Sequence, residues 1–317
     1  MSSKFPLHTF HFLGLMKIMQ VRTPRYINPY TDFGFKKLFG EEGNKDLLID
    51  FLNQLLPEEH QIVELNFKNS EFLPPLPFLR KAIFDIHCTG ANGENFIIEM
   101  QKEKLEYFKD RSIFYVSFPI QEQAIKGEWN FKLQHIYLIA ILDFKYDEEE
   151  EKKKFQRYVQ LKDQDGEVFY NKLHLKFLQM PLFTKTESEL VTRFDKWCYF
   201  LKNLETFDHI PTILKEPIFE KAFRTSEIGA MTKEEHDIYT ESLMTYWESK
   251  GMIDTARDEG KQIGLQKGEQ IGLQKGENKK AYDVTSKAIG MGLKNDEISL
   301  LTGLSVEEIQ KVREQKH

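Results

Sequence analysis

Cysteine is scarce in this 317-residue chain: only Cys88 and Cys198 occur, far apart and in apolar surroundings. Two such residues argue against a disulfide framework and against a cysteine-ligated zinc site, and they favour a reducing cytoplasm. We expect both to be buried as small apolar groups.

The chain also lacks an apolar run long enough to cross a bilayer. Its first 19 residues contain several Phe and Leu, but His8, His11 and Gly14 interrupt them, and no small-residue cleavage site follows. We therefore expect neither a membrane span nor a signal peptide. Residues 1–22 are predicted to be an N-terminal extension outside the fold.

A positive net charge is absent as well, since the formal net charge is −6. Any contact with DNA must come from a local basic surface, because Lys and Arg at the interface set the affinity for phosphates. The composition, with 40% hydrophobic and 13% aromatic residues, is that of a globular protein. The length allows one large domain with an appended segment.

What the sequence does contain is a β-hairpin with acidic residues. Residues 82–88 and 96–102 alternate in the two-residue period of a half-buried strand, and residues 89–95 between them are rich in Gly and Asn. A three-residue loop with Gly93 in the left-handed conformation sets the pairing. The predicted cross-strand pairs are Phe84 with Met100, Ile86 with Ile98, Cys88 with Phe96, Ile83 with Gln101, His87 with Ile97, and Asp85 with Glu99.

A two-residue turn at Asn92 and Gly93 is the stronger local pattern, but it would send Asp85 and Glu99 to opposite faces. We reject it because it would pair apolar with polar side chains along the whole ladder. In the favoured register the Cβ atoms of the two acidic residues lie roughly 4.5–5.5 Å apart. Like charges at that spacing repel each other, so the pair requires a cation.

Asp85 and Glu99 offer hard oxygen ligands suited to Mg²⁺ or Mn²⁺, which would hold a water and polarise a phosphoryl group. Gln101 projects on the same side as Glu99 and would orient the attacking water or the scissile phosphate. An ordinary solvated strand face is the alternative, and spacing alone does not decide between the two.

An Asp, a hairpin and then Glu-x-Gln on the next strand resemble the PD-(D/E)XK nuclease motif, in the variant in which Gln replaces Lys. The surrounding sequence resembles the Rpn family of recombination-promoting nucleases, which are also described as transposases. The similarity covers four ordered blocks: residues 26–40, the hairpin, residues 110–115 and residues 136–144.

This resemblance implies an α/β fold with a restriction-endonuclease-like mixed sheet flanked by helices, followed by a C-terminal helical tail. It also implies a metal-dependent DNA endonuclease that promotes recombination or transposition, with Asp85 and Glu99 as metal ligands and Gln101 as a catalytic residue. Mg²⁺ or Mn²⁺ would be the cofactor, and DNA the partner.

Four further residues are candidates near this site. Asp32 is either an auxiliary acidic group near the metal or, like Thr31, the cap of the helix that follows. Lys102 and Arg111 lie near the start of the next predicted helix and would hold a phosphate, and Tyr115 would share the face of Arg111 one turn on. A solvated basic helix start is the alternative reading of that segment.

The rest of the sequence between residues 23 and 250 predicts the other helices and strands of one domain. It predicts a loop at the prolines of residues 73–77 and a helix over 107–126 that contains Pro119 and is closed by Gly127. His174 is expected to be a sheet residue and not a ligand. The other predicted elements are a helix over 45–56, strands over 61–67, 135–144, 155–161 and 168–180, and covering helices over 187–250.

The tail changes character at residue 251. Residues 263–269 and 271–277 are identical, and the glycines in them each cost about 1 kcal/mol in a helix, so residues 251–282 should be a weak helix or a flexible tether. Residues 283–317 resemble half of a helix-turn-helix, with caps at Asn295 and Ser305. Glu307 and Glu308 oppose entry into a DNA groove, so we favour a protein contact or self-association there.

A non-catalytic DNA-binding or scaffolding protein that keeps the nuclease fold is the rival hypothesis. The acidic net charge and the neutral Gln101 in place of Lys favour it. Magnesium discriminates the two, because a binding module should shift DNA mobility without metal and never cut it. An RNA substrate also stays open, since no residue pattern here identifies the sugar.

Overall fold

The computed structural model describes residues 24–72, 82–104, 106–124, 130–146 and 153–315. The predictions for residues 1–22, for the proline loop and for Gly127 lie outside the described residues. The chain divides into two compact units, residues 1–250 and 251–317. The predicted boundaries at residues 22 and 282 stay predictions.

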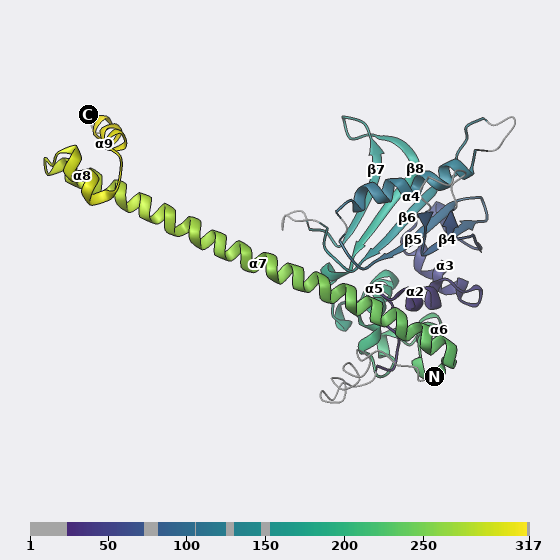
Figure 1. Cartoon of the computed structure of the whole chain (residues 1–317). Coiled ribbons are helices and arrows are strands. Elements are labelled where there is room, and N and C mark those ends of the chain that lie inside the picture. Colours follow the sequence, from purple (N-terminus) through teal and green to yellow (C-terminus); the bar gives the residue numbers. More distant parts are fainter. Residues whose placement is uncertain (1–23, 73–81, 105, 125–129, 147–152, 316–317) are drawn as a thin grey trace, which may run out of the picture. The chain divides into compact units, whose positions relative to one another are not determined.

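The first unit is built on a six-stranded mixed sheet with the strand order β1-β4-β5-β6-β8-β7 (Figure 1). Central β6 pairs in parallel with β5 and β8, and the other neighbours are antiparallel. Every residue of β6 is buried, and its position confirms the strand predicted over residues 135–144. The strands are β1 (Leu65–Phe67), β4 (Ile86–Gly90), β5 (Asn95–Gln101), β6 (Ile136–Leu142), β7 (Gln156–Lys162) and β8 (Val168–Gln179).

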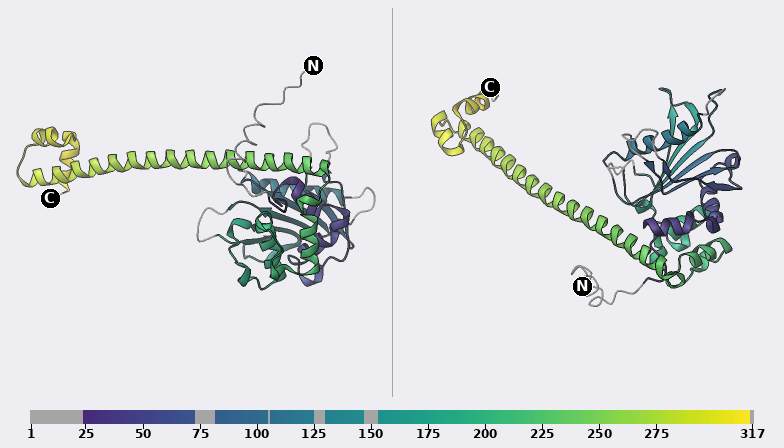
Figure 2. Two further views of the ribbon diagram at one scale, coloured as in Figure 1. Left: turned by 90° about the horizontal axis from the view of Figure 1, so that it is seen from below. Right: turned by 45° about the vertical axis from the view of Figure 1, so that its right-hand side comes forward.

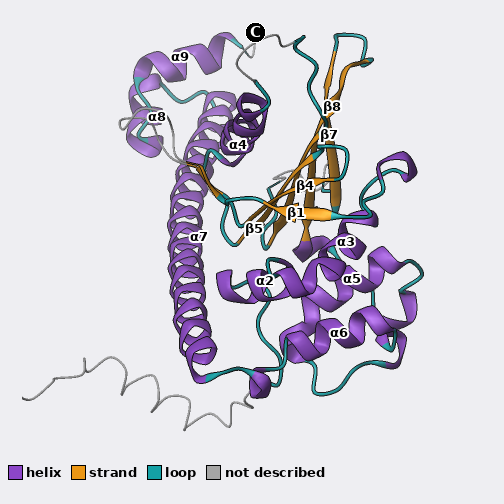
Figure 3. Cartoon of the chain, turned by 90° about the vertical axis from the view of Figure 1, so that its right-hand side faces the viewer, coloured by secondary structure: helices purple, strands orange, loops and turns teal. Residues whose placement is uncertain are grey.

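Helix α4 (Phe108–Glu122) covers one face of this sheet (Figure 3). It is shorter than the predicted range and contains Pro119. Alternate residues of a strand point to opposite faces, so Leu138 and Ala140 of β6 share an apolar cluster with Phe108 and Val116 of α4.

The other face is covered by α2 (Asp32–Phe39), α3 (Lys45–Asn53), α5 (Arg193–Asn203) and α6 (Pro217–Thr225). The apolar side chains of α3 and α5 are buried, and α5 contributes Trp197. Tyr137 and Ile139 of β6 belong to this larger cluster. The predicted helical cover of the sheet is thus confirmed.

Thr31, and not Asp32, caps helix α2. The Thr31 side chain accepts a hydrogen bond from the Gly34 backbone N at 3.0 Å, and Asp32 is the first helical residue. Gly34 lies against the preceding turn: a Cβ built on it would be 2.2 Å from the Asn28 carbonyl oxygen and 2.7 Å from Thr31 Oγ1. Only glycine fits at this position.

Replacing Gly34 by Ala should lower the free energy of unfolding by about 1–3 kcal/mol. The usual gain of Ala over Gly in a helix, roughly 0.5–1 kcal/mol, is smaller than the cost of moving backbone atoms. Urea denaturation measures the difference. Gly43→Ala is the control because no atom lies within 4 Å of its added Cβ, and equal stability of the two variants would contradict the packing argument.

Helix α7 (Lys233–Gly290) contributes its first turns to the first unit (Figure 2). The Tyr239 hydroxyl accepts a hydrogen bond from the Asn28 backbone N at 2.9 Å, and the Tyr246 hydroxyl donates to Asp143 Oδ2 at 2.9 Å. These contacts hold residues 233–250 against the core. Among the described helices, none has both the length and the apolar character needed to cross a membrane.

The second unit consists of residues 251–290 of α7 with α8 (Asn295–Thr302) and α9 (Val306–Glu314). Of the two alternatives predicted for the repeat segment, the structure has the helix. Ser305 caps α9 as predicted, but the cap of α8 is Lys294, so the prediction of Asn295 is wrong. A protein contact or self-association through this unit stays a prediction.

Candidate active site

The hairpin of β4 and β5 has the predicted register. Ile86 pairs with Ile98, His87 with Ile97 and Cys88 with Phe96. Gly93 has φ +84°, the left-handed conformation on which this register depends. The apolar alternation therefore outweighed the local preference for a two-residue turn.

The ladder ends one residue before the acidic pair, which corrects the rest of the prediction. Asp85 lies in a bend between β4 and β3 (Ala82–Ile83), and β3 pairs with β2 (Glu71–Phe72) in a separate two-stranded sheet. Ile83 therefore faces Glu71 and not Gln101. Phe84 lies on the α4 side, with its ring centroid 5.0 Å from that of Tyr115, and does not face Met100.

The Asp85 side chain accounts for this break. Its Oδ2 accepts a hydrogen bond from the Met100 backbone N at 2.6 Å, so the side chain occupies a donor that a continued ladder would use. Its own backbone N donates to Glu99 Oε1 at 3.3 Å. Asp85 and Glu99 are thus brought together by side chain to backbone hydrogen bonds instead of by strand pairing.

Both carboxyl groups are costly to ionise. Burial, followed by repulsion from Asp85, holds the pKa of Glu99 well above its ordinary value, although Arg111 and Gln101 act in the opposite direction. Glu99 is 3% exposed.

Burial also raises the pKa of Asp85, against the hydrogen bond from Met100, and the carboxylate of Asp32 raises it further. Lys36 and Lys102 lower it. Two neighbouring acids that are both costly to ionise form a site that a cation would stabilise.

Gln101, Arg111 and Tyr115 surround Glu99. Gln101 Nε2 donates to Glu99 Oε2 at 2.9 Å, and the Arg111 guanidinium lies 4.0 Å from the same oxygen. Arg111 Nε donates to the Tyr115 hydroxyl at 2.8 Å, which in turn donates to the Ile83 carbonyl at 3.2 Å. As predicted, Arg111 and Tyr115 share one helix face, but Tyr115 is buried.

Two spaces of different size adjoin the acidic pair. Asp85 lines a cleft of about 430 Å³ together with Asp32, Lys36 and Ser242, whereas Glu99 lines a cavity of about 10 Å³. The smaller space holds about one water. Of these two spaces, the cleft of Asp85 is the one with room for a phosphate.

The structure places Asp32 in the same cleft as Asp85, where it forms an ion pair with Lys36 at 3.0 Å. The sequence prediction missed Lys36 and Ser242, whose side chains come from α2 and α7. Ser242 lies more than 150 residues from Asp85 along the chain, so no local spacing could have indicated it.

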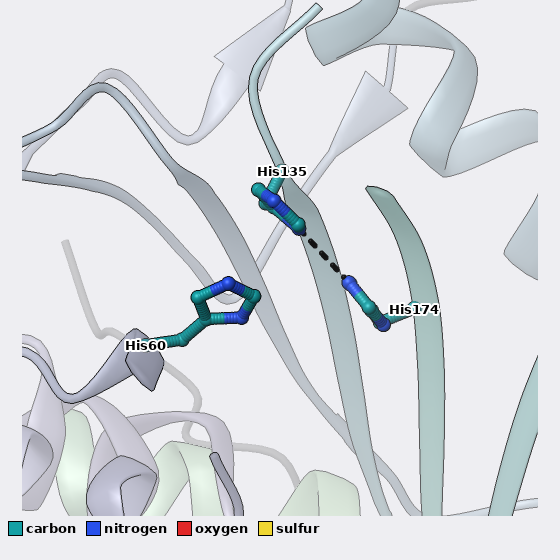
Figure 4. Close-up of side chains that lie close together, drawn as sticks. All are labelled: His60, His135 and His174. Carbon is teal, nitrogen blue, oxygen red and sulfur yellow. Dashed lines mark hydrogen bonds between the residues drawn. The ribbon is translucent and has the colours of Figure 1, made fainter. Parts of the chain in front are cut away.

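A second group of titratable residues was also missed. His60, His135 and His174 each offer a ring nitrogen, and these atoms lie within 4.8 Å of one another (Figure 4). His174 lies in β8 as predicted, but the gaps between the three residues in the sequence resemble no metal-ligand motif. Only folding brings them together.

The chain has a mixed sheet with helices on both faces, an Asp before one strand and Glu-x-Gln in the next. These features are typical of the PD-(D/E)XK nuclease class. The family model of the PD-(D/E)XK nuclease family transposase matches residues 29–256, more than half of the chain. The chain belongs to this family, which confirms the resemblance seen in the sequence. Neither a curated protein nor a solved structure matches it.

Proposed function

We propose that the protein is a divalent-metal-dependent DNA endonuclease that hydrolyses phosphodiester bonds and so promotes recombination or transposition. The observation that carries this proposal is the contact of the buried Glu99 with the half-buried Asp85, from the Asp85 backbone N to Glu99 Oε1 at 3.3 Å, within the matched family region. The free thiols of Cys88 and Cys198 support a reducing cytoplasm as its location.

Asp85 and Glu99 would hold Mg²⁺ or Mn²⁺. The fit is supported by the raised pKa of both groups and by the absence, among the described residues, of a Lys or Arg paired with Asp85. When bound, the cation supplies a Lewis acid and activates a water. Carboxylate oxygens are the donors that these hard cations prefer.

Gln101 would position the attacking water. Its amide nitrogen donates to Glu99, which leaves the amide oxygen to accept a hydrogen bond from a water beside the carboxylate. The oxygen of that water would form the new bond to phosphorus and release one proton to solvent, while the bond to the leaving oxygen breaks and that oxygen takes up a proton from solvent. Gln101 carries no charge, so it orients the water but does not neutralise the phosphate.

Arg111 and Lys102 would supply that neutralisation. Arg111 is 38% exposed at its side chain, and the Tyr115 hydroxyl holds its guanidinium near Glu99. Lys102 is partly exposed and acts electrostatically on Asp85. We propose Tyr115 as the residue that orients Arg111, because burial keeps it from the substrate, and Asp32 as an auxiliary acid across the cleft.

Arg111→Ala should lower kcat/KM for nicking by about 10²-fold, the usual cost of removing one donor that stabilises a developing negative charge. Arg111→Lys should recover only part of this loss. The Lys ammonium keeps the positive charge, but it lacks the planar set of donors of the guanidinium group. Arg224→Ala, which removes an exposed arginine on α6, is the control. Unchanged kinetics of Arg111→Ala would remove this residue from the proposed site.

Conversion of supercoiled plasmid to nicked and linear forms, with Mg²⁺ or with EDTA, tests the function itself. We expect conversion only with the metal. The rival DNA-binding or scaffolding role, favoured by the acidic net charge and the neutral Gln101, predicts a metal-independent mobility shift without cleavage. A parallel assay on RNA identifies the substrate class.

A further inference from the structure

Three histidines from separate elements converge on the sheet face opposite α4. His60 ends a 3₁₀ turn, η2 (Glu58–His60), after α3, and His135 directly precedes β6. His174 lies in β8, where it pairs with Tyr137 of β6. Tyr137 belongs to the apolar cluster of α2, α3 and α5. The cluster thus joins the helical layer to two strands.

The ring nitrogens already have the spacing of metal ligands. His135 Nδ1 and His174 Nε2 are 3.1 Å apart, and all three rings contribute atoms within 4.8 Å (Figure 4). Two nitrogens bound to one tetrahedral Zn²⁺ at 2.0–2.1 Å lie roughly 3.3 Å apart. A small rotation of the His60 ring would complete the set, and His60 is only partly buried.

We propose that His60, His135 and His174 form a Zn²⁺ site, with a fourth position for water. Neutral imidazole is the preferred nitrogen ligand of zinc, and three protein ligands leave a tetrahedral ion one position open. The bound ion would tie the turn after α3 to β6 and β8. Its role is to stabilise the fold.

Neighbouring tyrosines orient two of the rings. The Tyr158 hydroxyl lies 2.5 Å from His174 Nδ1 and also accepts a hydrogen bond from Gln160. If His174 Nδ1 donates its proton to Tyr158, the Nε2 lone pair faces the cluster, which is the arrangement that metal-binding histidines favour. The Tyr137 hydroxyl contacts His60 Nδ1. His60 would then bind the metal through Nε2, or through Nδ1 with loss of this contact.

The positive charges near the cluster are engaged by other groups. Lys172 and Lys176 are the nearby cations that oppose metal binding. Both turn their ammonium groups to backbone carbonyls, of Leu133 and Leu55 respectively.

This site is separate from the acidic pair. Asn95, whose backbone N donates to the His135 carbonyl, lies four residues from Glu99 along β5, or about 13 Å. Glu99 faces α4, whereas His174 and Tyr137 face the opposite layer. The ligand types differ as well, since oxygen donors select Mg²⁺ and imidazoles select Zn²⁺.

Zinc titration of the chelator-stripped full chain, by calorimetry and by competition with a chromophoric chelator, tests the proposal. We expect one equivalent to bind and to raise the melting temperature. His60→Gln should weaken this binding by about 100-fold or more, and Tyr158→Phe by roughly 10-fold. Asp85→Asn, which alters only the acidic pair, and His209→Gln, an exposed histidine, should bind zinc like the wild type.

His60→Gln is the decisive variant because it lies on a partly exposed turn and should fold even if His174→Gln does not. If His60→Gln binds zinc as tightly as the wild type, the proposed three-histidine site is wrong. Loss of the bound equivalent in Asp85→Asn would also overturn it, because zinc would then occupy the acidic pair. These outcomes do not depend on nuclease activity.

Discussion

Replacing Asp85 by Asn, or Glu99 by Gln, should reduce Mg²⁺-dependent plasmid nicking by roughly 10³-fold or more. A bound metal contributes several kcal/mol of charge stabilisation in the transition state, and each 1.4 kcal/mol is a factor of ten in rate. Both substitutions keep the size of the side chain. The Asn amide can still accept the hydrogen bond from the Met100 backbone N that shapes the bend.

The matched control for this experiment is Glu64→Gln, which removes a carboxylate that is exposed to solvent. Circular dichroism and melting temperature establish that each variant is folded. Because the two acids bind one cation, the double variant should lose little more than either single variant. Nicking by folded Asp85→Asn and Glu99→Gln at the wild-type rate would exclude these residues as the metal ligands.

Glu99→Gln should also make the protein more stable when the metal is chelated. Burial and the charge of Asp85 hold the folded-state pKa of Glu99 above its unfolded value of about 4.3, so this group lowers the stability of the folded state once the pH exceeds the unfolded value. Removing the titratable group removes this cost, so we expect the variant to have the higher free energy of unfolding at pH 8.

The pH dependence of this gain follows from the sign of the shift. Below the unfolded pKa the carboxyl group is protonated in both states, so wild type and Glu99→Gln should be equally stable there. The wild type then loses stability as the pH rises through the folded pKa, and the variant does not. Urea denaturation at several pH values in EDTA measures the difference, and a variant less stable than the wild type at pH 8 would contradict it.

Magnesium should reverse the order of stability, so that the wild type becomes more stable than Glu99→Gln. A ligand that binds only the folded state stabilises it by about 2.7 kcal/mol at a concentration of 100 Kd. The wild type should therefore gain stability with Mg²⁺, whereas Glu99→Gln should gain little. An equal gain for both proteins would place the Mg²⁺ ion elsewhere.

The hairpin shows which part of the candidate site could be predicted from the sequence. Strict alternation over two segments, with Gly93 in the turn, determines the register from Ile86 to Thr89. Alternation could not reveal where the ladder stops. That point depends on a hydrogen bond between the Asp85 side chain and the Met100 backbone, and the unfavourable position of an Asp in a strand was the one available sign.

The cleft and the histidine cluster could not be predicted from the sequence for a different reason. Ser242 reaches the cleft because Tyr239 and Tyr246 anchor the first turns of α7 on the core. The three histidines meet because β8 lies beside β6. Such contacts depend on the pairing of whole elements, which short spacings do not encode.

Anomalous diffraction from a crystal soaked in Mn²⁺ shows directly whether the acidic pair binds a metal ion. We expect one ion with an oxygen of Asp85 and an oxygen of Glu99 each at a coordination distance of about 2.1 Å. An ion held by only one of the two carboxylates, or none at the pair, would contradict the proposed metal site.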